Sequence, residues 1–149
     1  FFFKQKTAYE IVDCDWSSDV CSSDLTIAVC GTSLDKCYPT KNRTLFEKIN
    51  QIGLLISEYP PGTATKPFFF PQRNRLIAAL SLGTLVVEAA TKSGSLITAK
   101  CANELGREVF AIPNSISRLS SAGCHQLIKD GAKLTEKPSD IFDELRFFA

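Results

Sequence analysis

The sequence predicts an α/β fold with a mostly parallel sheet and helices on both faces. Short apolar runs alternate with helical patterns of about ten residues from Thr26 onward, the order expected of right-handed βαβ units. The runs LLI, VV and VFAI are apolar at consecutive positions, as in strands covered on both faces. A hydrophobic content of 44% with 22% charged residues excludes a collagen-like or disordered chain.

Five strands and five helices follow from these patterns. The strands contain consecutive apolar residues. The helix at 42–51 instead has apolar residues at helical spacing and ends at Gly53. Pro71 fits the first turn of a helix, and residues 58–70 are expected to form a loop. The expected strands are 26–30, 54–57, 84–89, 108–112 and 132–135, and the helices are 42–51, 71–81, 95–105, 123–129 and 138–145.

Residues 1–25 have a different character from the rest. They sustain neither a helical nor a strand period, and they lack the layout of a signal peptide. Residues 15–25 (DWSSDVCSSDL) resemble the forward translation of a short-read sequencing adapter. We therefore expect 1–25 to be a non-native, adapter-derived segment and 26–149 to be a partial domain. The alternative is a genuine acidic N-terminal arm.

Removing residues 1–25 changes the charge. The whole chain has 17 basic and 16 acidic residues, but 26–149 hold 15 and 11, a net charge of +4. A moderately basic domain suits phosphate binding better than the whole-chain value of +1. No apolar run reaches the 18–20 or so residues of a membrane helix, so no membrane partner is expected.

The cysteines of 26–149 predict neither a metal site nor a disulfide framework. No CxxC pair occurs, and none has ligand spacing to His125, the single histidine. Cys30 and Cys101 lie in apolar patterns and are expected to be buried, reduced thiols. This use of cysteine indicates a reducing cytoplasm, and no cofactor is expected.

Ligands of parallel sheets bind where the strands end, so three loops are candidates: 31–42, 68–75 and 89–98. In the third, Ser93, Gly94 and Ser95 precede a helix whose free N–H groups and dipole favour an anion, with Lys92 beside them. The alternative is that Ser93 or Ser95 only caps the helix. Neither a Walker loop nor GxGxxG occurs.

The second loop places Arg73 and Arg75 around Asn74 after three phenylalanines. Arginine matches phosphate geometry, and an exposed ring such as Phe70 can stack on a base. The alternative is that the rings are core and the arginines are solvated or paired with Glu58 or Glu88. Catalytic patterns are weaker: His125 lacks a partner motif, and no carboxylate pair singles out Glu58 or Glu88.

Several ordered motifs resemble those of one family. GTSLDKCYPTKN, LLISEYPPGT, FFFPQRNRLIAALS, LVVEAATKSGSLITAKCANELGREVFAIPNSI and GCHQLIKDGAKL are similar to the DprA/Smf family of DNA-processing proteins, over roughly 26–145. The resemblance implies a Rossmann-like domain that binds and protects single-stranded DNA in natural transformation. It further implies a homodimer that helps to load a RecA-type recombinase and is not an enzyme.

The same resemblance implies which residues bind DNA. Arg73, Asn74 and Arg75 match the family's FPxRNR element, and Lys92, Ser93, Gly94, Ser95 and Thr98 match its SGSxxT element. Both elements lie near the DNA pocket of the family, in agreement with the phosphate argument above.

The chain also departs from the family pattern. The upstream GxR and glycine-rich motifs are absent, Asn114 replaces the usual glycine after Pro113, and a winged-helix tail is absent. We therefore expect an internal fragment whose N-terminal part is missing, and residues 26–149 alone to be poorly soluble or molten because an apolar sheet edge is uncovered. The alternative function is a nucleotide hydrolase of the LOG phosphoribohydrolase type, against which the absence of PGGxGTxxE argues.

Overall fold

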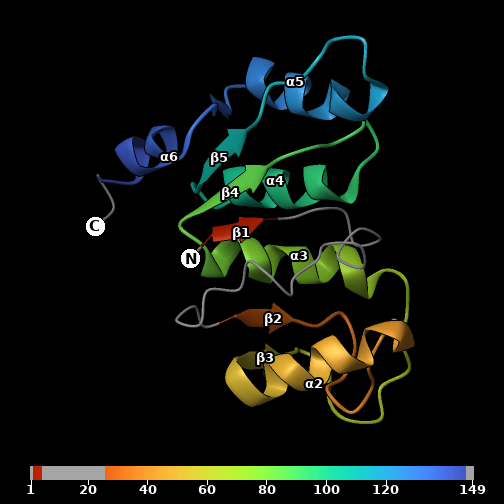
Figure 1. Cartoon of the computed structure of the whole chain (residues 1–149). Coiled ribbons are helices and arrows are strands. Elements are labelled where there is room, and N and C mark those ends of the chain that lie inside the picture. The colour runs from red at the N-terminus through yellow and green to blue at the C-terminus, as the bar shows by residue number, and fades with distance from the viewer. Residues whose placement is uncertain (1, 5–25, 147–149) are drawn as a thin grey trace. The chain divides into compact units, whose positions relative to one another are not determined.

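The computed structural model describes residues 2–4 and 26–146, which form two compact units (Figure 1). One unit comprises residues 2–4 with 74–146, and the other comprises residues 26–73. The division falls after Arg73, not after residue 25. Most of the segment predicted to be adapter-derived lies outside the described residues, so that assignment stays a prediction. Among the described residues, no helix has the length and apolar character needed to cross a membrane.

The larger unit, residues 74–146 with 2–4, contains a parallel four-stranded sheet. Its order is β1 (Phe2–Lys4), β4 (Gly83–Val86), β5 (Glu108–Ala111) and β6 (Lys133–Leu134). The predicted parallel arrangement is confirmed. β4 ends at Val86 rather than at residue 89, with a final bond from the Ile112 N–H to the Val86 carbonyl at 3.0 Å. The next residue on the β5 side, Pro113, has no N–H to extend the ladder.

Helices cover both faces of this sheet. α4 (Gly94–Glu104) and α5 (Ala122–Lys129) share a core with Val86 and Ala111, whereas α6 (Pro138–Leu145) packs on Phe110 from the other face. Phe110 and Ala111 are adjacent in β5 and both fully buried, because successive side chains of a strand point to opposite faces. The apolar run VFAI therefore reads correctly as a strand covered on both sides.

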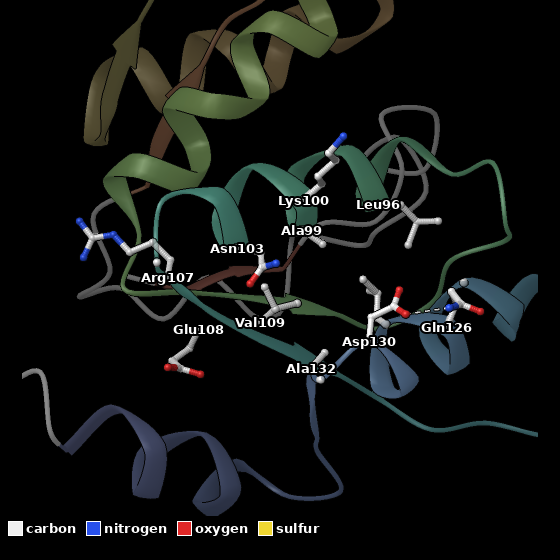
Figure 2. Close-up of a pocket in the computed structure, with 14 residues that line it drawn as sticks. Leu96, Ala99, Lys100, Asn103, Arg107, Glu108, Val109, Gln126, Asp130 and Ala132 are labelled. Atoms are coloured by element: carbon white, nitrogen blue, oxygen red, sulfur yellow. Dashed lines mark hydrogen bonds between the residues drawn. The ribbon is translucent and has the colours of Figure 1, made fainter.

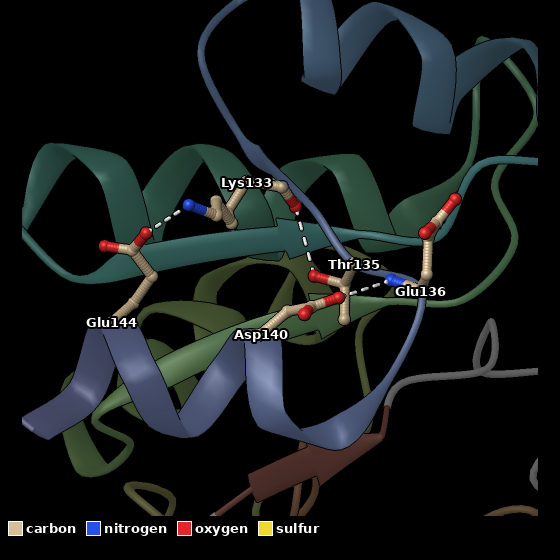
Figure 3. Close-up of polar contacts among 5 residues, drawn as sticks. All are labelled: Lys133, Thr135, Glu136, Asp140 and Glu144. Carbon is tan, nitrogen blue, oxygen red and sulfur yellow. Dashed lines mark hydrogen bonds and ion pairs between the residues drawn. The ribbon is translucent and has the colours of Figure 1, made fainter.

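Polar contacts hold α6 beside the end of the sheet (Figure 3). The Asp140 carboxylate accepts the N–H groups of Glu136 at 2.9 Å and Lys137 at 3.1 Å, as expected of an acidic residue in the first turn of a helix. These bonds lower the pKa of Asp140 below its usual range. Lys133 of β6 forms an ion pair with Glu144 on the next turns of α6.

The smaller unit, described over 26–73, has a two-stranded parallel sheet. β2 (Ile27–Val29) pairs with β3 (Leu54–Ile56), and the connection between them contains η1 (Thr40–Asn42) and α2 (Arg43–Ile52). No side chain of α2 is fully buried. Gly53 ends α2 because a Cβ there would lie 2.3 Å from the Thr26 carbonyl oxygen. At the predicted stop, glycine is required because the backbone of Thr26 approaches it closely.

α3 (Phe69–Leu80) begins earlier than the sequence predicted. Phe69 and Phe70 belong to the helix, not to the loop expected through residue 70. The Phe69 N–H bonds to the Lys66 carbonyl at 3.1 Å, and Phe70 bonds to Pro67 at 3.3 Å. These turns start the helix two residues before Pro71, which still falls in the first turn, where its missing N–H costs nothing.

Candidate nucleic-acid interface

The amino terminus of α4, in the larger unit, is open to solvent. The Ser93 Oγ accepts the Ser95 N–H at 3.4 Å and lies 2.7 Å from the Ser95 Oγ, so Ser93 does cap the helix. A Cβ built on Gly94 would meet nothing within 4 Å, and both Gly94 and Lys92 are exposed. A phosphate could therefore approach the first turn, where N–H groups and the helix dipole favour negative charge.

Not every residue of this segment is accessible. Ser95 and Thr98 are fully buried in α4. The Thr98 hydroxyl has no hydrogen-bond partner in the described chain, and neither does the buried hydroxyl of Thr84. A fully buried side chain cannot touch a ligand in this conformation. The structure thus separates the exposed Lys92 and Gly94 and the half-buried Ser93 from residues that only pack the helix.

The three residues of the RNR element have different environments. The Arg73 Nη1 donates to the Val29 carbonyl at the end of β2, within the smaller unit. Burial lowers the pKa of Arg73, although its guanidinium is charged near neutral pH. Asn74 is buried and Arg75 is exposed, and both belong to the larger unit. Arg73 thereby holds the start of α3 against the carboxyl end of β2.

Phe70, the ring predicted to stack on a base, is half-buried. It lies 5.5 Å from the Tyr38 ring, and a Cβ on Gly31 would come within 2.8 Å of its Cδ1 atom. The more exposed rings nearby are Phe68 and Tyr38, and Lys66 lies 5.7 Å from the Phe68 centroid. Lys66 and Tyr38 were missed by the sequence reasoning. Tyr38 lies in the loop 31–42, which was singled out only by its position after a strand.

Two of the residues considered for catalysis, His125 and Glu88, lie apart in structural surroundings. The His125 Nε2 lies 2.9 Å from the Asn114 carbonyl oxygen and thus fastens the loop that precedes α5. Glu88 follows the end of β4 and is half-buried. Across 2–4 and 26–146, no group of three or more His, Cys, Asp or Glu side chains could hold a metal ion.

The cysteines differ from expectation in their burial. Cys30 and Cys101 are half-buried, whereas Cys124 is fully buried beneath β4, with its Sγ 3.7 Å from the Val86 carbonyl oxygen. Burial raises the pKa of the Cys30 and Cys124 thiols. The burial of each thiol depends on which face of its strand or helix it occupies. The apolar pattern of the sequence does not specify that face.

A cavity of about 470 Å³ lies elsewhere in the larger unit, between α4 and α5 (Figure 2). Glu108 and Val109, which open β5, and Ala132, which precedes β6, line it. The strand residues that line it lie at the amino ends of β5 and β6, whereas Leu96 and Gly123, in the first turns of α4 and α5, extend its lining toward the other edge of the sheet. Lys100 and Arg107 stand among acidic residues there, namely Glu108 and Asp130, so the cavity has no single charge sign.

Comparison with known proteins identifies the family. Residues 17–146 match the family described as DNA recombination-mediator protein A, and the chain belongs to it. The match begins inside the segment 1–25. The chain is 51% identical over 122 residues to the DNA processing protein DprA of Streptococcus pneumoniae, covering 82% of this chain and 43% of that protein. It is 54% identical over 120 residues to the protein Smf of Synechocystis, covering 80% and 30%, respectively.

Two solved structures share the fold. The DprA structure from Streptococcus pneumoniae superposes with a TM-score of 0.76 at 51% identity, covering 80% of this chain and 42% of the other. The DprA structure from Helicobacter pylori, described as revealing a unique single-stranded DNA binding mode, has a TM-score of 0.73 at 32% identity, covering 80% and 55%. The Rossmann-like α/β prediction is confirmed. The matched region of the chain thus spans less than half the length of the curated relatives above.

Proposed function

We propose that this chain contributes a single-stranded DNA-binding surface for DNA uptake in natural transformation. The observation that carries the proposal is the open amino terminus of α4, with Gly94 unobstructed and Lys92 exposed beside it. Family membership supports it, since a relative of the same fold is described as binding single-stranded DNA. Binding of this kind depends mainly on phosphate contacts and reads little sequence.

The burial pattern refines the proposed role of each residue. Lys92, Ser93 and Gly94 contact phosphate at the terminus of α4, and the exposed Arg75 supplies a further cation. Ser95, Thr98 and Asn74 are buried, so we assign them to positioning. Arg73 donates to the Val29 carbonyl and orients the first turns of α3, which carry Phe70.

A salt titration of DNA binding tests the proposal. The full chain carrying Lys92→Ala is compared with the full chain carrying Lys129→Ala. The control removes an exposed charge from the last turn of α5, a different helix from the one that follows Lys92. Affinity for a labelled oligothymidine is measured by fluorescence anisotropy from low to moderate salt. We expect Lys92→Ala to weaken binding and to reduce the salt slope by about 0.7, the contribution of one phosphate contact on a single strand.

Comparison with Lys129→Ala shows which result would contradict the proposal. If Lys92→Ala and Lys129→Ala lower affinity and slope equally, the lysines act only through net charge, and the assignment to the α4 terminus is wrong. Arg75→Ala, measured in the same series, should reduce the slope by a similar amount, because the exposed side chain is accessible to a phosphate.

The nucleotide-hydrolase alternative is not favoured. It needs a general base, and Glu88 lies after β4 without a second carboxylate or a histidine partner in the contacts of the described residues. The family and its structural relatives are DNA-processing proteins. Release of a nucleobase from a nucleoside monophosphate, abolished by Glu88→Gln, would revive this alternative.

The wider context follows the family. We propose a cytoplasmic protein that acts as a homodimer, passes its single strand to a RecA-type recombinase and needs no cofactor. We also propose that the native part of this chain begins near Thr26, that residues 1–25 are foreign to it, and that 26–149 are only part of a domain. Genomic sequence read through the junction of Leu25 and Thr26 tests this boundary, because a foreign segment would not appear there.

A further inference from the structure

The smaller unit presents two exposed aromatic side chains near the ends of its strands. Tyr38, in the loop after β2, is 60% exposed, and Phe68, immediately before α3, is 52% exposed. Their neighbour Phe69 is 8% exposed. Aromatic rings carry a large apolar area that is unfavourable in water. The contrast shows that the fold buries one ring of the FFF run and leaves another available to a ligand.

Each exposed ring rests on an inner ring. Tyr38 lies 5.5 Å from Phe70, with a 43° angle between the planes. Phe68 contacts Phe69 edge-on at 4.8 Å. Phe69 in turn stacks on Tyr59 at 3.9 Å and 22°. The two outer rings are therefore held by packing, which lowers the entropy lost when a planar ligand binds.

The loops that carry these rings are also tied together. The Lys36 Nζ donates to the carbonyls of Gly62 at 3.3 Å and Thr63 at 3.0 Å. The Asp35 carboxylate accepts the Gly62 N–H at 3.0 Å. The loop after β2 is thus fastened to the loop after β3 by contacts in which neither Tyr38 nor Phe68 takes part.

Positive charge accompanies the exposed rings. The Lys66 ammonium lies 5.7 Å from the centroid of Phe68, and Lys41 is exposed three residues after Tyr38. The nearby acid Asp35 is engaged with the Gly62 N–H. A planar ring next to a cation is the combination that binds a nucleotide, with its base on the ring and its phosphate on the cation.

We propose that Tyr38 and Phe68 are two base-stacking positions for unpaired nucleotides, with Lys66 contacting the adjoining phosphate. The inference rests on the proposed function and adds the basis on which single strands are selected. In a duplex the base faces are covered by their neighbours in the stack, so the rings bind only nucleotides that are unstacked. Stacking also tolerates any base, in keeping with binding that reads little sequence.

The test compares an oligothymidine with an abasic oligonucleotide of equal length, which has the same phosphates and no bases. Both are titrated with the full chain, with Tyr38→Ser, with Phe68→Ser and with the double variant. We expect the unaltered chain to prefer the oligothymidine. Each serine variant should lose about 5- to 150-fold of that preference, the range measured for one stacked base. Affinity for the abasic strand and its salt slope should stay unchanged.

Matched variants separate stacking from folding. Tyr38→Phe and Phe68→Tyr keep a ring and should retain the preference. Ile116→Ser removes an apolar side chain that is 93% exposed in the larger unit and should also retain it. A thermal melt of each variant shows whether Tyr59 and Phe69 still pack. If a serine variant melts early, the leucine variant at the same position, which keeps apolar volume but has no ring, replaces it in the comparison.

The outcomes distinguish the two proposals. Equal binding of both oligonucleotides by the unaltered chain would overturn the stacking inference and leave the phosphate site intact. An unchanged preference in the double serine variant would also overturn it, since the bases would then stack elsewhere. Binding of neither oligonucleotide would overturn the proposed function itself.

Discussion

The two units of the chain use their apolar residues in different ways. The larger unit buries Val86, Ala99 and Phe110 between a parallel sheet and helices on both faces. The smaller unit has two strands of three residues and a helix without a fully buried side chain, and it is ordered by loop hydrogen bonds and ring contacts. The first unit should therefore be sensitive to loss of volume, and the second to loss of individual polar contacts.

Phe110→Ala is expected to have the largest effect. Its ring is fully buried in β5, where Ile141 and Leu145 of α6 pack on it. Deleting such a ring costs about 3–5 kcal/mol through lost transfer free energy and the cavity left behind. Urea unfolding followed by circular dichroism measures the loss. Ile116→Ala, at an exposed position, should change stability by less than about 0.5 kcal/mol, and equal losses would refute the layered core.

Gly123→Ala should come next, because it inserts a methyl group between two backbone segments. A Cβ there would lie 2.7 Å from the Ala89 carbonyl oxygen and 2.8 Å from that of Ala90. The Gly123 N–H also donates to Ala89 at 2.7 Å. We expect a loss of about 1–3 kcal/mol. Gly94→Ala is the matched control, since its Cβ meets nothing, and it should leave the urea midpoint unchanged or raise it.

Arg73→Met tests the smaller unit through one polar contact. The variant keeps much of the side-chain volume but leaves the Val29 carbonyl without the guanidinium donor. The expected cost is about 1–3 kcal/mol, the range for a buried group that loses its partner. Arg118→Met removes an equal charge from an exposed side chain of the larger unit and should unfold at the unaltered midpoint. Equal midpoints for both variants would show that Arg73 does not hold α3 against β2.

Asp140→Asn should have the smallest effect, visible mainly in its pH dependence. The pKa of Asp140 is lowered by the backbone N–H groups of Glu136 and Lys137. Its contribution to stability is therefore present above the ordinary carboxyl pKa of about 3.9 and is lost as the pH falls through the lower folded value. Unfolding midpoints of the two proteins should differ at pH 6 and converge near pH 2. A constant difference across that range would contradict the role of the charge.

Much of the fold was predictable because its signals are local. The strands at Leu54–Ile56 and Glu108–Ala111 were expected from short apolar runs, and α4 from its serine cap. The start of α3 was not predicted correctly, since three phenylalanines before a proline fit a loop or a helix equally well. Stacking of Phe69 on Tyr59, a contact across ten positions of the chain, accompanies the helical start.

The candidate site was predictable in type rather than in detail. The residue types of Lys92, Ser93 and Gly94 and their place after a strand indicated an anion site from the sequence. Burial could not be read in the same way, because Ser95 and Thr98 are as polar as Ser93 and yet are fully enclosed. Whether these residues and the arginines of the RNR element bind DNA stays a prediction.

Hydrophobic periodicity and motif spacing are properties of neighbouring residues, and they predicted the order of strands and helices over 26–149, the family and the sheet edge at which ligands bind. They did not predict β1, at Phe2–Lys4. The bond from Arg73 to a strand carbonyl, the burial of Phe69 and the exposure of Phe68 and Tyr38 became visible only in the folded chain. The physical reason is that exposure depends on what other segments place against a side chain. Phe70 packs near Tyr38 and Gly31, and Tyr59 stacks on Phe69. Folding brings these separate segments together around the exposed rings.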